Sequence, residues 1–91
     1  MQTFIIDCRG IKTEDEFWQR YIDVTNPEGR RYFGRNLDAF WDAVEGGGPG
    51  WPGECELTFT NVDALRALGR PFLKEFENIA RDATQTKIEL I

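Results

Sequence analysis

Three carboxylates and three aromatic side chains fall within the sixteen residues NLDAFWDAVEGGGPGW, and this stretch contains no Lys, Arg or His. The carboxylates belong to Asp38, Asp42 and Glu45. Closely spaced carboxylates can act as a general acid and base, as paired acids do in glycosidases. They can also offer negative oxygens to a cationic partner. The rest of the sequence decides between catalysis and binding.

The chain lacks the residues that most kinds of catalysis require. It contains no His and no Ser, which excludes Ser-His triads, Cys-His pairs and histidine metal sites. Cys8 and Cys55 form no CxxC motif and have no histidine partner, so neither a zinc site nor a redox pair is supported. The loop GGGPGWPG lacks the GK[ST] of a phosphate-binding loop. Since so small a domain has little room for a sugar cleft, we expect no enzyme, no cofactor and no metal.

The charge distribution indicates a cationic partner. The net charge is -5, but the stretch from Asn36 to Leu65 has six acids and no cation, so the rest of the chain is close to neutral. Such an acidic face attracts basic proteins and repels nucleic acids and anionic membranes. The first residues, MQTFIID, have no basic segment and only three consecutive apolar residues. We therefore expect a cytoplasmic protein with reduced, buried cysteines.

The expected elements alternate between strands and helices. They are a strand buried on both faces (3–6), a helix capped by Thr13 (to about residue 24), a helix capped by Asn36 (37–45), a strand (54–60), a helix capped by Asn61 (62–68), a helix with Pro71 in its first turn, and a final strand (87–91). Helical crossovers favour a parallel arrangement. The sequence thus predicts an α/β fold, a three-stranded parallel sheet with about four helices packed against it, in one domain of residues 1–91. The two cysteines would lie at opposite ends of neighbouring strands, roughly 15 Å apart and beyond disulfide reach.

The helix that follows Asn36 separates acid from core. At about 100° per residue, Asp38, Asp42 and Glu45 occupy an arc of roughly 60°, and the apolar residues gather opposite. Trp41 lies between the two sides, so the core cannot fully cover it. Like charges four residues apart cost about 0.2–0.5 kcal/mol, so local stability does not favour this pattern. A half-exposed Trp ringed by charge is typical of a protein-binding surface.

The segment YFGRNLDAFWDAV, from Tyr32 to Val44, resembles the segment of the barstar family that enters the active site of the secreted ribonuclease barnase. That family segment runs Tyr-Tyr-Gly-Glu-Asn-Leu-Asp-Ala-Leu-Trp-Asp. Chain length, element order and the apolar last strand are also similar. The resemblance implies an intracellular ribonuclease inhibitor with a three-stranded parallel sheet.

The resemblance also implies roles for individual residues. Asp42 would occupy the phosphate site of the enzyme, facing its arginines, lysine and histidine, and Asp38 would pair with an adjacent arginine. Glu45 stands where the family has a neutral contact residue and would add an ion pair. Further family contact positions are matched by Tyr32, Asn36, Leu37, Trp41 and Gly46.

Three features depart from the family pattern. Arg35 replaces a glutamate, and it either repels an arginine-rich target or points away. The glycine-rich loop is longer, and Trp51 either covers the partner or folds back over Trp41. Where the family has an acid on its last helix, this chain has Asn78, and Glu77 is the residue before it.

The leading hypothesis is an inhibitor of a small, basic, secreted, guanyl-preferring ribonuclease, in which carboxylates imitate RNA phosphates. We expect a monomer that forms a one-to-one heterodimer with this enzyme. The alternative is an acidic adaptor or antitoxin module that binds a different basic protein, one that is not a nuclease.

Overall fold

Strands and helices follow each other in the order that the sequence predicts, with one additional short helix. The computed structural model describes residues 1–91. Its elements are β1 (Gln2–Asp7), α1 (Glu14–Thr25), η1 (Arg30–Tyr32), α2 (Leu37–Gly46), β2 (Cys55–Thr60), η2 (Val62–Leu68), α3 (Arg70–Asp82) and β3 (Lys87–Leu90). The additional element is η1, a single 3-10 turn between α1 and α2.

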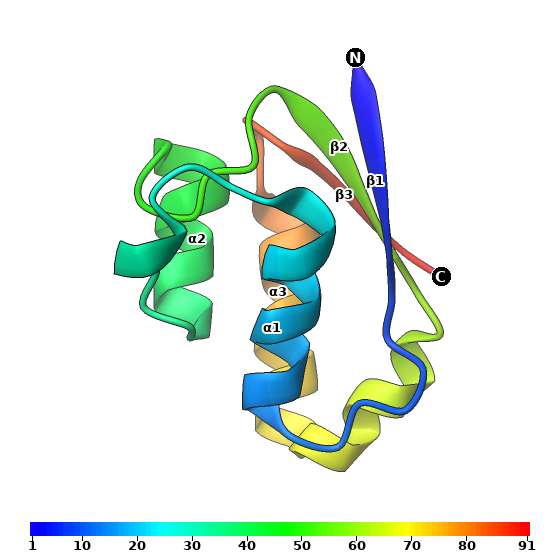
Figure 1. Cartoon of the computed structure of the whole chain (residues 1–91). Coiled ribbons are helices and arrows are strands. Elements are labelled where there is room, and N and C mark those ends of the chain that lie inside the picture. The colour runs from blue at the N-terminus through cyan, green and yellow to red at the C-terminus, as the bar shows by residue number, and fades with distance from the viewer.

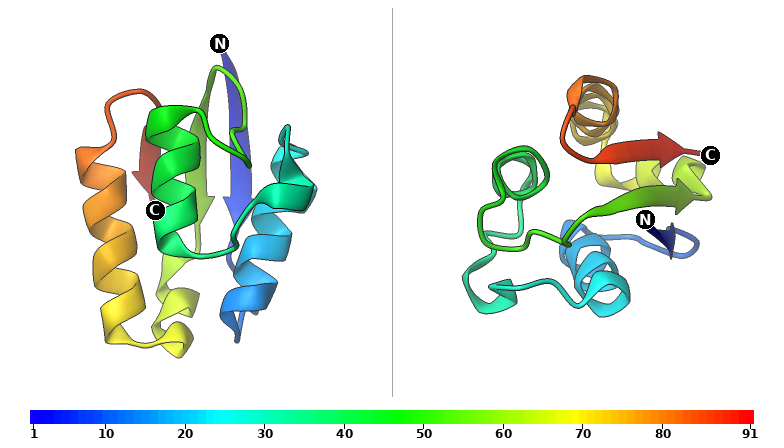
Figure 2. Two further views of the ribbon diagram at one scale, coloured as in Figure 1. Left: turned by 90° about the vertical axis from the view of Figure 1, so that its left-hand side faces the viewer. Right: turned by 90° about the horizontal axis from the view of Figure 1, so that it is seen from above.

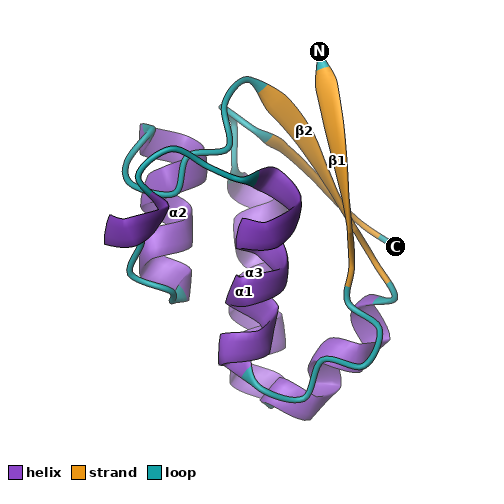
Figure 3. Cartoon of the chain, viewed as in Figure 1, coloured by secondary structure: helices purple, strands orange, loops and turns teal.

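The three strands form a parallel sheet in the order β1-β2-β3, which confirms the predicted α/β fold. The three α-helices lie on one face of this sheet, and η2 passes beneath the carboxyl ends of the strands (Figure 1). The view from above in Figure 2 and the colouring of Figure 3 show the same two layers. Right-handed crossovers that step through a sheet in one direction place their helices on the same side. The strand order therefore leaves the other face uncovered.

The prediction that the first strand is buried on both faces is wrong. Burial alternates along the strands, so that Leu57 and Phe59 of β2 face the helices and the residues between them face outward. In β1 the outward residue Ile5 is 62% exposed, whereas Ile6 is buried. A run of apolar residues indicates two covered faces only when helices flank the sheet on both sides.

Aromatic rings fill the space between the sheet and the helices. Phe17 of α1 packs edge-on against Trp18 and Phe76, with ring centroids 4.7 and 5.2 Å apart. Phe40 of α2 packs in the same way against Tyr21, at 5.4 Å. Edge-to-face pairs of this kind add about 0.5–1.5 kcal/mol each beyond the area they bury. This cluster fixes α1 and α2 relative to each other and to the sheet.

Thr13 and Asn61, two of the three predicted helix caps, behave differently. The Oγ1 atom of Thr13 accepts a hydrogen bond from the Glu16 backbone N–H, 3.2 Å away, so the predicted cap of α1 is confirmed. The predicted Asn61 cap is wrong, because Asn61 has a left-handed backbone (φ 54°) and its side chain makes no capping bond. Its amide instead donates to Oδ1 of Asp7, 2.8 Å away. The segment that follows is a 3-10 helix rather than an α-helix.

Both cysteines are free and buried, as predicted. Cys55 lies opposite Gln2 in the sheet, whereas Cys8 follows the other end of β1, so the strand register keeps the two thiols apart. Burial raises the pKa of the Cys8 thiol to about 11. The helices are all too short or too polar to cross a membrane.

Candidate functional site

The acidic helix α2 starts from a cap that its own sequence supplies. The Oδ1 atom of Asn36 accepts a hydrogen bond from the Ala39 backbone N–H at 2.7 Å. The Asn36 amide donates to the carbonyl of Gly34 at 3.3 Å, which also fixes the turn before the helix. Asn36, which was predicted as a partner contact, thus has a structural role as the cap of α2. Its two bonds fix the direction in which α2 presents its acids.

Helix α2 divides into a buried side and an exposed acidic side. Phe40 and Ala43 are completely buried, whereas Asp38 and Asp42 are exposed and take part in no ion pair. Trp41 is half-buried between these two sides, as predicted. The two carboxylates are one helical turn apart and free of internal partners, so both are available to an external cation.

Leu37 was predicted as a contact residue, but it belongs to the core. Only 9% of its surface is exposed, and it lies in the main hydrophobic cluster. What remains accessible faces two surface hollows where α2 meets α3. Leu37 therefore supports the exposed side of α2 from beneath.

The two hollows between α2 and α3 adjoin each other, and both are bordered by acids. They share Leu37, Asp38 and Glu75, and one of them also includes Trp41. The other hollow is bordered by a further acid, Glu14 of α1. Glu75, a residue that the sequence analysis did not single out, thus adds a carboxylate from α3 beside those of α2.

The acid that sequence reasoning considered on α3 lies elsewhere. Glu77 borders a different hollow, together with Arg66 and Arg70. Asn78 does line the hollow with Trp41, as does Glu75 three residues earlier. Residues three positions apart lie on the same face of a helix. The position of Glu75, three residues before Asn78, could therefore have identified it from the sequence.

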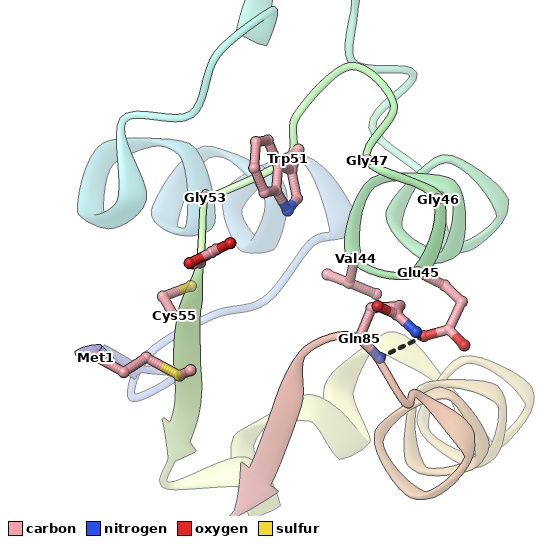
Figure 4. A pocket seen from close by; sticks show the side chains of 10 residues that line it. Met1, Val44, Glu45, Gly46, Gly47, Trp51, Gly53, Cys55 and Gln85 are labelled. Carbon is pink, nitrogen blue, oxygen red and sulfur yellow. Dashed lines mark hydrogen bonds between the residues drawn. The ribbon is translucent and has the colours of Figure 1, made fainter.

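Glu45 is the third predicted acid of α2, and its carboxylate is already bonded within the molecule. Oε1 accepts from the backbone N–H groups of Thr84 and Gln85 at 2.8 and 3.0 Å, and Oε2 accepts from the Thr84 hydroxyl at 2.6 Å. Figure 4 shows the bond to Gln85. These bonds, the Thr84 hydroxyl first, lower the pKa of Glu45 below its ordinary value of 4.5. Glu45 thus joins α2 to the turn between α3 and β3.

The glycine-rich loop after α2 has a fixed conformation. The N–H groups of Gly47 and Gly48 bond back to the last turn of α2, and Gly47 is left-handed, which ends the helix. Gly46, a predicted contact, is exposed at this end. Further along, the Tyr21 hydroxyl donates to the Gly50 carbonyl at 2.8 Å. A Cβ atom at Gly50 would lie 2.5 Å from the Phe33 ring, so only glycine fits there.

Trp51 points from this loop into a hollow between the end of α2 and the start of β2 (Figure 4). Met1, Val44 and Cys55 line the same hollow. Trp41 lines a different hollow, next to α3. Of the two alternatives for Trp51, folding back over Trp41 is not observed, and coverage of a partner stays a prediction.

The segment before α2 carries Tyr32 and Arg35. Tyr32 is 80% exposed at the end of η1. Arg35 turns toward α1, where it forms an ion pair of 2.9 Å with Asp15 and also donates to the Gln19 side chain. Of the two alternatives for Arg35, pointing away from the acidic side is the one observed.

The predicted site residues therefore fall into three groups. Asp38, Trp41 and Asp42 form one exposed surface on α2, while Tyr32 and Gly46 flank it on the neighbouring segments. Asn36, Leu37 and Glu45 chiefly hold this surface in place. Nowhere in the chain do three or more acids or cysteines come together in a way that could hold a metal ion. The arrangement offers negative oxygens and aromatic surface to a protein.

Comparison with known protein families finds a match over almost the whole chain. The profile of the family described as Barstar (barnase inhibitor) matches residues 1–90. No curated protein matches the chain.

Proposed function

Because the chain belongs to the barstar family of barnase inhibitors, we propose that it inhibits a small, basic, secreted, guanyl-preferring ribonuclease. In this proposal α2 enters the active site of the enzyme and blocks the access of RNA. The family is one of inhibitors rather than catalysts, and its partner is a ribonuclease. The kind of target enzyme and the roles of the individual residues belong to this proposal.

One observation carries the proposal: Asp38 and Asp42 are exposed on a capped helix and have no cationic partner of their own. A site that binds RNA phosphates presents arginine and lysine side chains, and two fixed carboxylates offer oxygens of the same charge. Because helix α2 is already ordered, little conformational entropy is lost when these oxygens are bound. Preorganised charge of this kind favours both affinity and correct orientation.

The residues of the surface then have distinct roles. Asp42 binds at the phosphate site and Asp38 pairs with an arginine next to it. Glu75 supplies a further carboxylate across the groove from α3. Trp41 and Tyr32 provide aromatic contact area on either side of the acids. The rigid loop that begins at Gly46 closes one end of the cleft.

The acidity of the molecule supports fast association. With a net charge of -5 and a pI of about 4.6, the inhibitor attracts a basic enzyme over a distance. We place this encounter in the cytoplasm of the producing cell, where the inhibitor protects RNA from an enzyme meant for export. The complex contains one inhibitor and one enzyme.

The test is to titrate the protein into a panel of small basic ribonucleases that includes barnase, and to follow RNA cleavage. We expect complete inhibition of at least one enzyme at a one-to-one ratio. Association should slow as the salt concentration rises beyond about 0.15 M, where the Debye length is about 8 Å. Stoichiometric protein that inhibits no enzyme of the panel would count against the proposal.

A capture experiment distinguishes the alternative of a different basic partner. The immobilised protein is exposed to extract from the native cell, with the Asp42→Lys variant as the matched control. A ribonuclease retained only by the wild type supports inhibition. A basic protein without nuclease activity, retained in the same way, would instead identify an adaptor or antitoxin.

A further inference from the structure

Three arginines cluster immediately before the acidic helix. The segment GRRYFGR, from Gly29 to Arg35, contains three cations and no acid, in a chain with a net charge of -5. Arg30 and Arg31 form the start of η1, and Tyr32 ends it. This cationic segment adjoins the surface that we propose as the inhibitory site.

The three arginines differ in what they bind. Arg35 is paired with Asp15 of α1, and Arg30 donates to the Asn26 side chain at 3.0 Å. Arg31 is exposed and makes neither an ion pair nor a side-chain hydrogen bond. Its charge is therefore free, like those of Asp38 and Asp42.

The segment that carries Arg31 is rigidly held. Phe33 is 5% exposed and packs against the rings of Trp18 and Tyr21, with centroids 5.6 and 5.7 Å away. Before η1, the Glu28 carbonyl accepts from the N–H of Gly50 at 3.0 Å. These anchors on both sides fix η1, so the position of Arg31 is set by the fold rather than by a mobile loop.

The arrangement gives the proposed surface two signs of charge. In the left view of Figure 2, α2 lies in the middle, with α3 on one side and η1 on the other. Toward α3 the exposed charges are the acids Asp38 of α2 and Glu75 of α3. On η1 the exposed charges are the cations Arg30 and Arg31, and the exposed acid Glu28 precedes Arg30 by two residues. No ion pair joins these arginines to these acids within the molecule.

From this pattern we infer that Arg31 contacts a carboxylate on the partner, at the rim of its cationic cleft. The inference rests on the proposed function, and it specifies the target further. A cleft surrounded only by cations would repel η1, whereas a cleft with an acidic rim on that side matches both signs. Opposite charges placed in this way fix the orientation of docking and reject partners with the wrong pattern.

The test compares two charge reversals of equal size. Arg31→Glu and Arg66→Glu both change the net charge by the same amount, and Arg66 lies on η2, outside the proposed surface. Each variant is measured against the ribonuclease that the wild type inhibits most tightly. We expect Arg31→Glu to raise the Kd at least about tenfold and Arg66→Glu to change it less than about twofold, since only a charge within the interface meets a like charge directly.

A second step identifies the partner group. Carboxylates that border the active-site cleft of the ribonuclease are replaced by Lys one at a time, and one replacement should restore tight binding of Arg31→Glu. Arg31→Gln, which adds no negative charge, should show a smaller loss of affinity, and circular dichroism should show all variants folded.

Other results would overturn the inference. Arg31→Glu that binds as tightly as the wild type would show that η1 meets no carboxylate. Equal losses for Arg31→Glu and Arg66→Glu would reveal an effect of total charge alone. In both cases inhibition by the wild type leaves the proposed function intact. A wild type that inhibits no ribonuclease refutes that function and this inference together.

Discussion

Asp42 and Glu45 lie about one turn apart on α2, yet only the Glu45 carboxylate is hydrogen-bonded within the chain. Glu45 accepts three hydrogen bonds from Thr84 and Gln85, whereas Asp42 accepts none from any side chain and has no ion pair. The difference comes from the neighbouring elements. The turn between α3 and β3 reaches Glu45, and no element of the chain covers Asp42. A carboxylate that the chain itself saturates stabilises the fold, and one left unsaturated is available to a partner.

The exposed pair is maintained at a local cost. Asp38 and Asp42 are four residues apart, and their repulsion costs about 0.2–0.5 kcal/mol on an isolated helix. Burial of Phe40 and Val44 on the opposite side of α2 outweighs this cost, at about 1.5–3 kcal/mol for each large apolar side chain. The core therefore permits a helix with a charge pattern that local stability alone would not favour.

The largest expected effect comes from Asp42→Ala. If Asp42 binds at a cationic active site, its removal leaves partner cations unpaired, which typically costs ~2–5 kcal/mol or about 30- to 4,000-fold in Kd. The melting temperature should stay the same or rise slightly, because the repulsion with Asp38 is relieved. Inhibition titrations and thermal melts of the same preparation measure both quantities. Glu77→Ala, on the far side of α3, is the control, and equal effects of the two substitutions would contradict a specific role for Asp42.

Glu45→Gln should show the reverse pattern, with a lower melting temperature and inhibition within about threefold of the wild type, since its contacts are internal. The amide keeps the shape but replaces one acceptor oxygen with a donor facing the Thr84 and Gln85 N–H groups.

The stability effect of Glu45 should depend on pH in one direction. Because the folded protein has the lower Glu45 pKa, the ionised carboxylate stabilises the fold at neutral pH. This contribution is lost as the pH falls below about 4.5 and through the lowered pKa of the folded state. The difference in melting temperature between wild type and Glu45→Gln should therefore shrink in acid. A difference that grows on acidification would contradict the bonding described for Glu45.

The sequence predicted features that depend on neighbouring residues better than features that depend on distant ones. The caps Thr13 and Asn36 lie next to the helices they start, so the pattern of nearby residues was enough to predict them. Asn61 was misread because its partner, Asp7, lies fifty-four residues away in the chain. The role of Glu45 likewise depends on Thr84, thirty-nine residues away.

The uncovered sheet face and the acid on α3 were missed for the same reason. Exposure of Ile5 depends on the direction of both crossovers, which the apolar run in β1 does not encode. The choice between Glu75 and Glu77 depends on how α3 is rotated against α2. Local patterns predicted the elements and the exposed acids, and contacts between distant elements decided which acids remain free.

A smaller effect is expected for Glu75→Gln. Glu75 borders the groove beside Asp38 and Trp41, so loss of its charge should weaken binding by about three- to tenfold, as expected for a pair at the rim of an interface. Glu77→Gln removes the same charge two residues away and should leave the Kd unchanged. Surface plasmon resonance at two salt concentrations separates the association and dissociation rates. If Glu77→Gln has the greater effect, the partner lies on the other side of α3.

The smallest effect is expected for Arg35→Gln. Its ion pair with Asp15 is largely exposed, and such pairs contribute only about 0–1 kcal/mol to stability. Arg35 also points toward α1, away from Asp42, so its positive charge barely offsets the acidic surface. We expect less than a twofold change in the association rate, measured by stopped-flow mixing with the inhibited ribonuclease. Asp15→Asn is the matched control, because it breaks the same pair but leaves the cation in place. If Arg35→Gln speeds association tenfold while Asp15→Asn does not, Arg35 repels the partner directly, and the separation between the acidic surface and its neighbouring cation is incomplete.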